Sequence, residues 1–88
     1  MGNEITAAQI AEMRREAEGR ADHTMVATCR LADCFDASDA DSLALQATRL
    51  PVLSPARVAC GWARSYFVTP DAARKECASR YPAYMATP

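Results

Sequence analysis

The sequence has few of the residue types that usually carry catalysis. Among 88 residues it contains one histidine and three glycines, and it has no glycine-rich phosphate loop, no Gly-x-Ser-x-Gly motif and no His-Glu-x-x-His motif. His23 precedes Cys29 by six residues, which places the two on different parts of a helix surface, so no catalytic Cys–His pair is indicated. The sequence therefore predicts a protein that is not an enzyme and that uses no cofactor.

Long hydrophobic runs are also missing. No segment approaches the ~20 apolar residues that a membrane-spanning helix needs. The N-terminal residues Met-Gly-Asn-Glu-Ile-Thr lack the basic region and apolar stretch of a signal peptide. We therefore expect a cytoplasmic protein without a membrane partner.

A strong charge of either sign is absent as well, since the formal net charge is −1. The charges are nevertheless segregated: residues 1–50 carry nine acidic and five basic side chains, whereas residues 51–88 carry two acidic and five basic ones. Because affinity for nucleic acids depends on the number of phosphates neutralised, this composition does not favour a nucleic-acid partner.

The four cysteines do not have the spacing of a zinc site. Cys29, Cys34, Cys60 and Cys77 are separated by four, twenty-five and sixteen residues, whereas zinc ligands usually come in close pairs. We favour free cysteines that act as small buried hydrophobic residues. The alternative is a secreted helical protein with two disulfides, either Cys29–Cys60 with Cys34–Cys77 or Cys29–Cys77 with Cys34–Cys60.

The periodicity of apolar residues predicts an all-α fold. Nineteen alanines favour helix formation, and caps and prolines divide the chain into short helices. The expected caps include a capping box of Thr6 with Gln9 and, for the second helix, Asp22. The expected helices cover residues 7–18, 23–35, a segment that starts within 36–41 at a Ser38–Asp41 capping pair and reaches Leu50, then 54–68 and 70–80. We predict one compact domain, 1–88, of four to five short helices. Pro82 should end the last helix, and the 81–88 tail should pack back on the bundle through Tyr84 and Met85.

The segment 54–68 is expected to be the central helix of the bundle. Ser54 is suited to cap it and Pro55 to occupy its first position. Its apolar residues, which include the only tryptophan, Trp62, cover about 200° of the helix surface, more than a surface helix usually buries. Either the other helices close around this segment, or part of it is a binding face, and the burial of Trp62 distinguishes the two.

Two charged surfaces are candidate docking sites for a protein partner. The first is the acidic run with Asp33, Asp36, Asp39 and Asp41, which could face a basic partner or occlude a nucleic-acid-binding groove. The second is the basic stripe with Arg57 and Arg64. The sequence thus favours a small inhibitor or adaptor of bacterial or phage origin, of the kind that mobile genetic elements use to block host defence or nucleic-acid-binding complexes. Homodimerisation is compatible with the small core.

A DNA-binding regulator is the alternative from a different functional class. The consecutive helices 54–68 and 70–80 resemble a helix-turn-helix arrangement, with Arg74 and Lys75 on the second helix. The turn lacks the usual glycine, however, and the basic residues of the second helix are few and are mixed with Asp71 and Glu76. An ordinary corner between two helices explains the pattern better.

Overall fold

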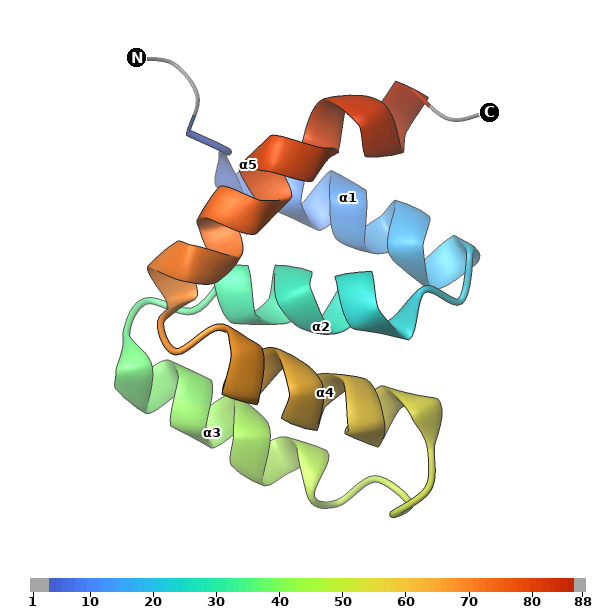
Figure 1. Ribbon diagram of the computed structural model, residues 1–88, viewed down its shortest axis with the longest axis vertical. Helices are drawn as coiled ribbons and strands as arrows, with labels where there is room; N and C mark the ends of the chain where they lie inside the picture. Colours follow the sequence, from blue (N-terminus) through green and yellow to red (C-terminus); the bar gives the residue numbers. More distant parts are fainter. Residues whose placement is uncertain (1–3, 87–88) are drawn as a thin grey trace.

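The computed structural model describes residues 4–86 and confirms the predicted all-α fold. The described residues form five helices and no β-strand. The helices are α1 (Ala7–Gly19), α2 (His23–Ala32), α3 (Ala37–Ala47), α4 (Pro55–Tyr66) and α5 (Pro70–Ala86). The packing of these short helices on one another gives a small bundle (Figure 1).

Local capping signals set most of the helix starts. Thr6 and Gln9 form the expected capping box at α1, and the Asp22 carboxylate accepts from the Met25 amide at the start of α2. The hydroxyl of Ser54 accepts from the Arg57 amide, as predicted for α4. Each of these side chains satisfies an amide that has no partner within its helix.

Some boundaries of α2 and α3 differ from the prediction. α3 is capped by Asp36 rather than by Ser38, and it ends at Ala47 instead of reaching Leu50. α2 ends at Ala32 rather than Phe35, and Arg74 of α5 donates to the carbonyl oxygens of Ala32 and Cys34 at this end.

The last helix does not stop at Pro82, contrary to the prediction, but continues to Ala86. Pro82 is exposed and cannot donate to the carbonyl of Ala78, which weakens the helix at this point. The final turns are held by Tyr84, whose ring packs against the core as expected for the tail. Residues 87 and 88 of the predicted 81–88 tail lie outside the described residues.

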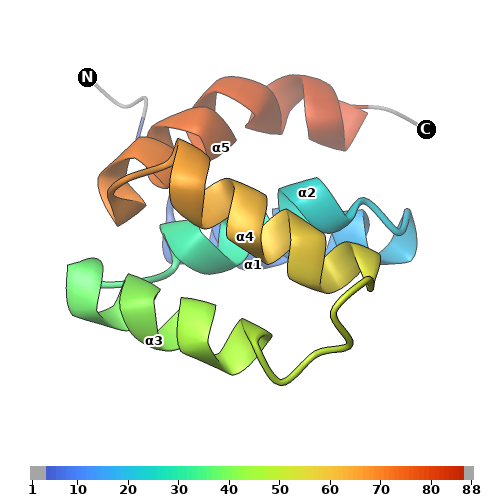
Figure 2. The ribbon, with the colours of Figure 1, turned by 60° about the horizontal axis from the view of Figure 1, so that its bottom comes forward.

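The helices are arranged in a defined order along the long axis of the molecule. α1, α2, α4 and α3 follow one another, and α5 crosses over α1 and α2 (Figure 1). After a turn of 60°, α5 and α3 lie at opposite edges with the other helices between them (Figure 2). α4 therefore packs on α2 and α3.

The helix at the centre of the bundle is α2, whereas the sequence suggested the segment 54–68. α2 contacts all four other helices, and Arg30 is its only charged side chain. A helix that is apolar on nearly all sides must be covered by its neighbours, and small side chains let those neighbours approach closely. Its buried residues are Met25, Ala27, Thr28, Cys29, Leu31 and Ala32.

Candidate protein-interaction surface on α4

The acidic run lies at the start of α3, where its carboxylates cap the helix. Asp36 Oδ1 accepts from the Asp39 amide at 3.0 Å, and Asp39 Oδ2 accepts in return from the Phe35 amide at 2.9 Å. The two acids thus satisfy amides around the beginning of α3, and Asp39 also suits the positive end of the helix dipole. Asp33 is exposed at the end of α2 and lies outside this pair.

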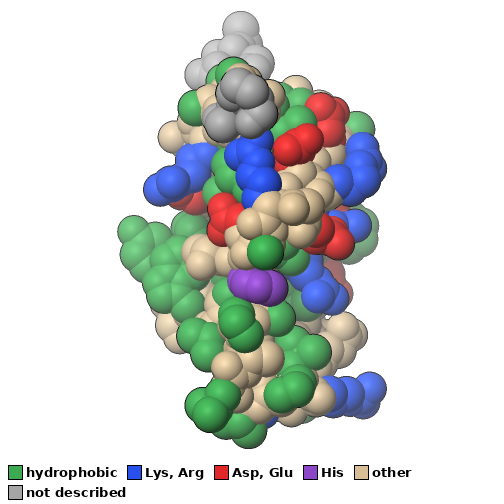
Figure 3. All heavy atoms as spheres, turned by 90° about the vertical axis from the view of Figure 1, so that its right-hand side faces the viewer, with side chains coloured by type: hydrophobic (Ala, Val, Ile, Leu, Met, Phe, Trp, Pro, Cys, Tyr) green, Lys and Arg blue, Asp and Glu red, His purple; other side chains and the backbone are tan. Residues whose placement is uncertain are grey.

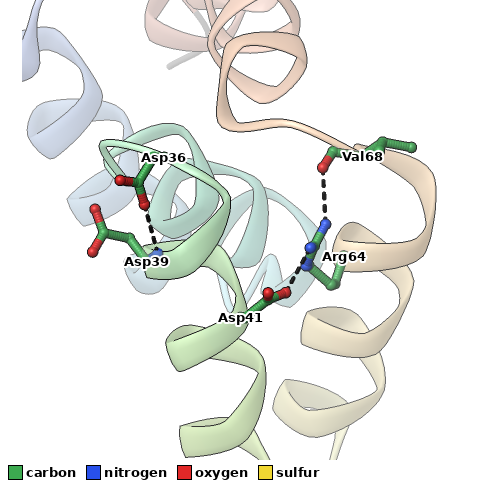
Figure 4. A network of polar contacts seen from close by, with 5 residues as sticks. All are labelled: Asp36, Asp39, Asp41, Arg64 and Val68. Carbon is green, nitrogen blue, oxygen red and sulfur yellow. Dashed lines mark hydrogen bonds and ion pairs between the residues drawn. The ribbon is translucent and has the colours of Figure 1, made fainter.

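Asp41 connects α3 to α4 through an arginine (Figure 4). Its Oδ1 atom accepts from Nη2 of Arg64 at 2.7 Å. Nη1 of the same guanidinium donates to the carbonyl oxygen of Val68 at 2.9 Å, just beyond the end of α4. Arg64 is therefore held between an acid of α3 and the segment that leads into α5.

Arg57 has a similar structural role at the other end of α3. Its Nη1 atom donates to the carbonyl oxygens of Thr48 and Leu50 at 3.4 and 3.2 Å. Because the last carbonyls of a helix have no partner within it, this guanidinium stabilises the end of α3. Intramolecular contacts thus engage Arg57, Arg64, Asp36, Asp39 and Asp41, and a binding role for these residues and Asp33 stays a prediction.

A different part of α4 is exposed and apolar. Val58, Trp62 and Tyr66 follow one another at intervals of four residues, which places them on the same side of the helix. Their exposed fractions are 59%, 44% and 67%. The helix packs into the bundle through the small side chains of Ala59 and Ala63. We call Val58, Trp62 and Tyr66 the α4 apolar face.

The buried ring of Phe67 supports the aromatic rings of the α4 apolar face. The rings of Trp62 and Tyr66 stack with centroids 5.2 Å apart and planes inclined by 17°. Both rings also contact the buried ring of Phe67 edge-on, at 5.8 and 4.9 Å. Since Phe67 belongs to the core, the exposed pair is pre-positioned and loses little side-chain freedom when another molecule covers it.

Further hydrophobic side chains are exposed at both ends of α4. Val52 and Leu53 precede the helix and Val68 follows it, and all three are exposed. In Figure 3 hydrophobic side chains gather over the lower half of the molecule, where α3 and α4 lie, whereas most charged side chains lie over the upper half. Large exposed apolar patches on small proteins mark interaction sites more often than isolated apolar residues do.

No charged side chain belongs to the exposed side of α4. The exposed residues there are Pro55, Val58, Gly61, Trp62, Ser65 and Tyr66. The sequence pattern placed Arg57 and Arg64 on the solvent side together with Gly61 and Ser65. The structure instead separates Arg57 and Arg64 from Gly61 and Ser65, because both arginine side chains turn toward α3. An arginine near a helix end, such as Arg57, can donate to the free carbonyl groups at the C-terminus of a neighbouring helix. This role was not predicted from the sequence.

The four cysteines are free in the structure, and the burial that the favoured interpretation expected is found for two of them. Cys29 of α2 and Cys77 of α5 are fully buried, and a hydrogen bond between the two thiols, together with burial, raises the pKa of Cys29. Cys34 and Cys60 are partly exposed. Among residues 4–86, no three His, Cys, Asp or Glu side chains come together as the ligands of a metal ion would.

A pocket of about 660 Å³ lies between the start of α1 and α5. Its charged side chains include Arg74, Lys75 and Asp71. Lys75 pairs with Asp71 at 3.5 Å, and Arg74 donates to the carbonyl oxygens of Ala32 and Cys34. Intramolecular contacts thus engage both basic side chains of this pocket.

The basic side chains of α5 are those on which the predicted alternative, a DNA-binding regulator, depends. Besides Arg74 and Lys75, the helix carries Arg80, which is paired with Glu76. Each of the three bases has an intramolecular partner, so no observation on this helix specifically favours duplex binding.

In the described part of the chain, no helix has the length and apolar character needed to cross a membrane. Comparisons with protein-family models, with curated proteins and with solved structures find no match to this chain.

Proposed function

We propose that this protein is a non-enzymatic, cytoplasmic binding protein that docks onto a protein partner through the α4 apolar face. The observation that carries the proposal is the exposure of Trp62 and Tyr66, stacked on each other and supported by the core residue Phe67. Tryptophan and tyrosine contribute most of the binding energy in many protein interfaces.

The finer part of the proposal is an inhibitor or adaptor of bacterial or phage origin. It rests on the small size of the protein and on its segregated charge. In such a protein the α4 apolar face would provide the affinity, and the exposed carboxylate of Asp33 would be available to a basic group of the partner.

Partner capture with matched variants tests the docking face. The double variant Val58→Ser/Tyr66→Ser removes apolar area from the exposed side of α4, and both side chains are more than half exposed, so the fold should persist. Leu45→Ser is the control, since Leu45 is 68% exposed on α3 and lies about 140° around that helix from the buried Ala40. A protein captured by the wild type and Leu45→Ser, but not by the double variant, supports the proposal.

The acidic run needs a separate variant. Changing Asp36, Asp39 and Asp41 together would remove the α3 cap and the Arg64 ion pair, so lost capture would not distinguish binding from folding. Asp33→Asn changes an exposed carboxylate outside these contacts. Capture that is unchanged in the double variant and reduced in Asp33→Asn would contradict docking through α4 and favour the acidic surface.

A further inference from the structure

The exposed side of α4 carries large aromatic side chains next to two positions with a small or absent side chain. Trp62 and Tyr66 stand out from the helix, whereas Gly61 and Ser65, one turn apart, have little or no side chain. A β-carbon added at Gly61 would meet no atom within 4 Å. Two copies related by a two-fold axis can therefore place the aromatic side chains of one copy against Gly61 and Ser65 of the other.

Nothing within the protomer requires glycine at position 61. The residue lies in the middle of α4, where glycine is less favourable than alanine for helix stability, and its backbone has no left-handed conformation that would call for it. Packing of a large side chain from a second copy is a physical reason for this residue, because glycine has no side chain that would occupy the space.

Charge and area also fit a second copy of the chain. A charged surface repels an identical surface, and the exposed side of α4 has no charged residue. The exposed fractions of Val52, Leu53, Val58, Trp62, Tyr66 and Val68 correspond to roughly 800 Å² of surface, which is about what one partner contributes to an interface of standard size.

We infer that two copies of this chain associate through their α4 helices into a symmetric dimer, with Trp62 of each copy packed against Gly61 and Ser65 of the other. This inference rests on the proposed function, because it names the partner of the same surface. The dimer would cover the apolar side chains that the alanine-rich protomer leaves exposed.

Sedimentation equilibrium from about 1 µM to about 1 mM protein tests the inference, and the emission of the single tryptophan provides a second readout. We expect a dimer mass at high concentration and a shift of the emission to shorter wavelength as Trp62 is covered. Gly61→Gln should raise the dissociation constant about 30-fold or more, since its side chain would occupy the space in which a central aromatic residue of the other copy packs. Val58→Glu should have the same effect by placing a charge in the interface.

Gly61→Gln also replaces glycine by a better helix former in open space, so unfolding of the protomer cannot account for a lost dimer. Leu45→Glu is the control and should leave the dissociation constant unchanged. A monomer at every concentration would overturn the inference, and so would a dimer that persists in both α4 variants. If the wild type is a monomer but the Val58→Ser/Tyr66→Ser variant still loses a captured partner, self-association fails and the proposed function stands.

Discussion

The hydroxyl group of Tyr84 donates a hydrogen bond of 3.2 Å to Oδ2 of Asp22, and this contact joins the last turns of α5 to the first turn of α2. The other carboxylate oxygen of Asp22 caps α2 by accepting from the Met25 amide. The guanidinium of Arg20 lies 4.4 Å from the centre of the Tyr84 ring. One aromatic side chain therefore fastens the helix after Pro82 to the α1–α2 junction.

Ionisation of Tyr84 should weaken the folded state at alkaline pH. Burial and the neighbouring Asp22 carboxylate raise the pKa of Tyr84 above its ordinary value, so the folded protein holds this proton more strongly than the unfolded chain does. The contribution is complete below about pH 10, where tyrosine titrates in an unfolded chain, and is lost as the pH rises through the folded-state pKa.

We therefore expect Tyr84→Phe to lose less stability than the wild type between about pH 9 and pH 11. Urea unfolding at a series of pH values measures this difference. Burial also raises the pKa of Tyr81, but that side chain is present in both proteins, so the comparison isolates Tyr84. Equal losses in the two proteins would contradict the expectation.

Ala21 has an unfavourable backbone conformation between α1 and α2. Its φ angle is 55°, and the amides of Ala21 and Asp22 donate to the carbonyl oxygens of Glu18 and Ala17. This pattern is a Schellman motif, in which glycine usually occupies the position of Ala21. Because a β-carbon is strained in this conformation, Ala21→Gly should raise the free energy of unfolding by about 1 kcal/mol.

The same exchange at an exposed helical position is the control for Ala21→Gly. Ala8 lies in the first turn of α1 and is exposed, so Ala8→Gly should lower the free energy of unfolding, by up to about 1 kcal/mol. Chemical denaturation of both variants measures the two values. Destabilisation by Ala21→Gly would show that the strain at this position is not relieved by removing the β-carbon.

The parts of the fold that sequence reasoning predicted are those set by local chemistry. The capping residues Thr6, Asp22 and Ser54 each act on the amide three residues away, so their pattern can be read directly from the sequence. The predicted end of α5 was wrong. Pro82 is a local signal for a helix end, but the contact of Tyr84 with the distant Asp22 holds the turns that follow it.

The identity of the central helix and the position of the candidate site could not be predicted from the pattern of apolar and charged residues. Both depend on which helices lie side by side in the fold. The large side chains around Trp62 suggested that this segment forms the core. In the structure, the buried residues of α4 are the small ones, Ala59 and Ala63. Arg57 and Arg64 looked like a solvent-facing stripe, since nothing local reveals that α3 lies beside them. Trp62 is exposed, so the other helices do not close around segment 54–68, and a binding role for its exposed part stays a prediction.

Arg74 should contribute more to stability than the neighbouring Lys75. Its Nη1 atom donates to the carbonyl oxygens of Ala32 and Cys34 at 2.9 and 2.8 Å, in a partly buried position at the end of α2. Arg74→Met retains the apolar stem but leaves both carbonyls without this donor, which should cost about 1 to 2 kcal/mol.

Lys75→Met is the matched control, because Lys75 is exposed and its pair with Asp71 is on the surface. We expect its effect on the free energy of unfolding to stay within about 0.5 kcal/mol. Thermal or urea unfolding of both variants measures the difference. Similar values for the two would mean that the α2 carbonyls are satisfied without Arg74.

The four thiols should divide into two classes when the native protein is treated with a thiol reagent. Cys34 and Cys60 are partly exposed and should react in the folded state, although burial and the nearby carboxylates of Asp39 and Asp33 raise the pKa of Cys34 and so slow its reaction at neutral pH. Cys29 and Cys77 are fully buried and should react only as fast as the protein unfolds. Mass spectrometry after timed labelling counts the modified thiols, and labelling of the unfolded chain should give four. A smaller number in the unfolded protein would indicate a disulfide and would revive the alternative of a secreted, disulfide-linked helical protein.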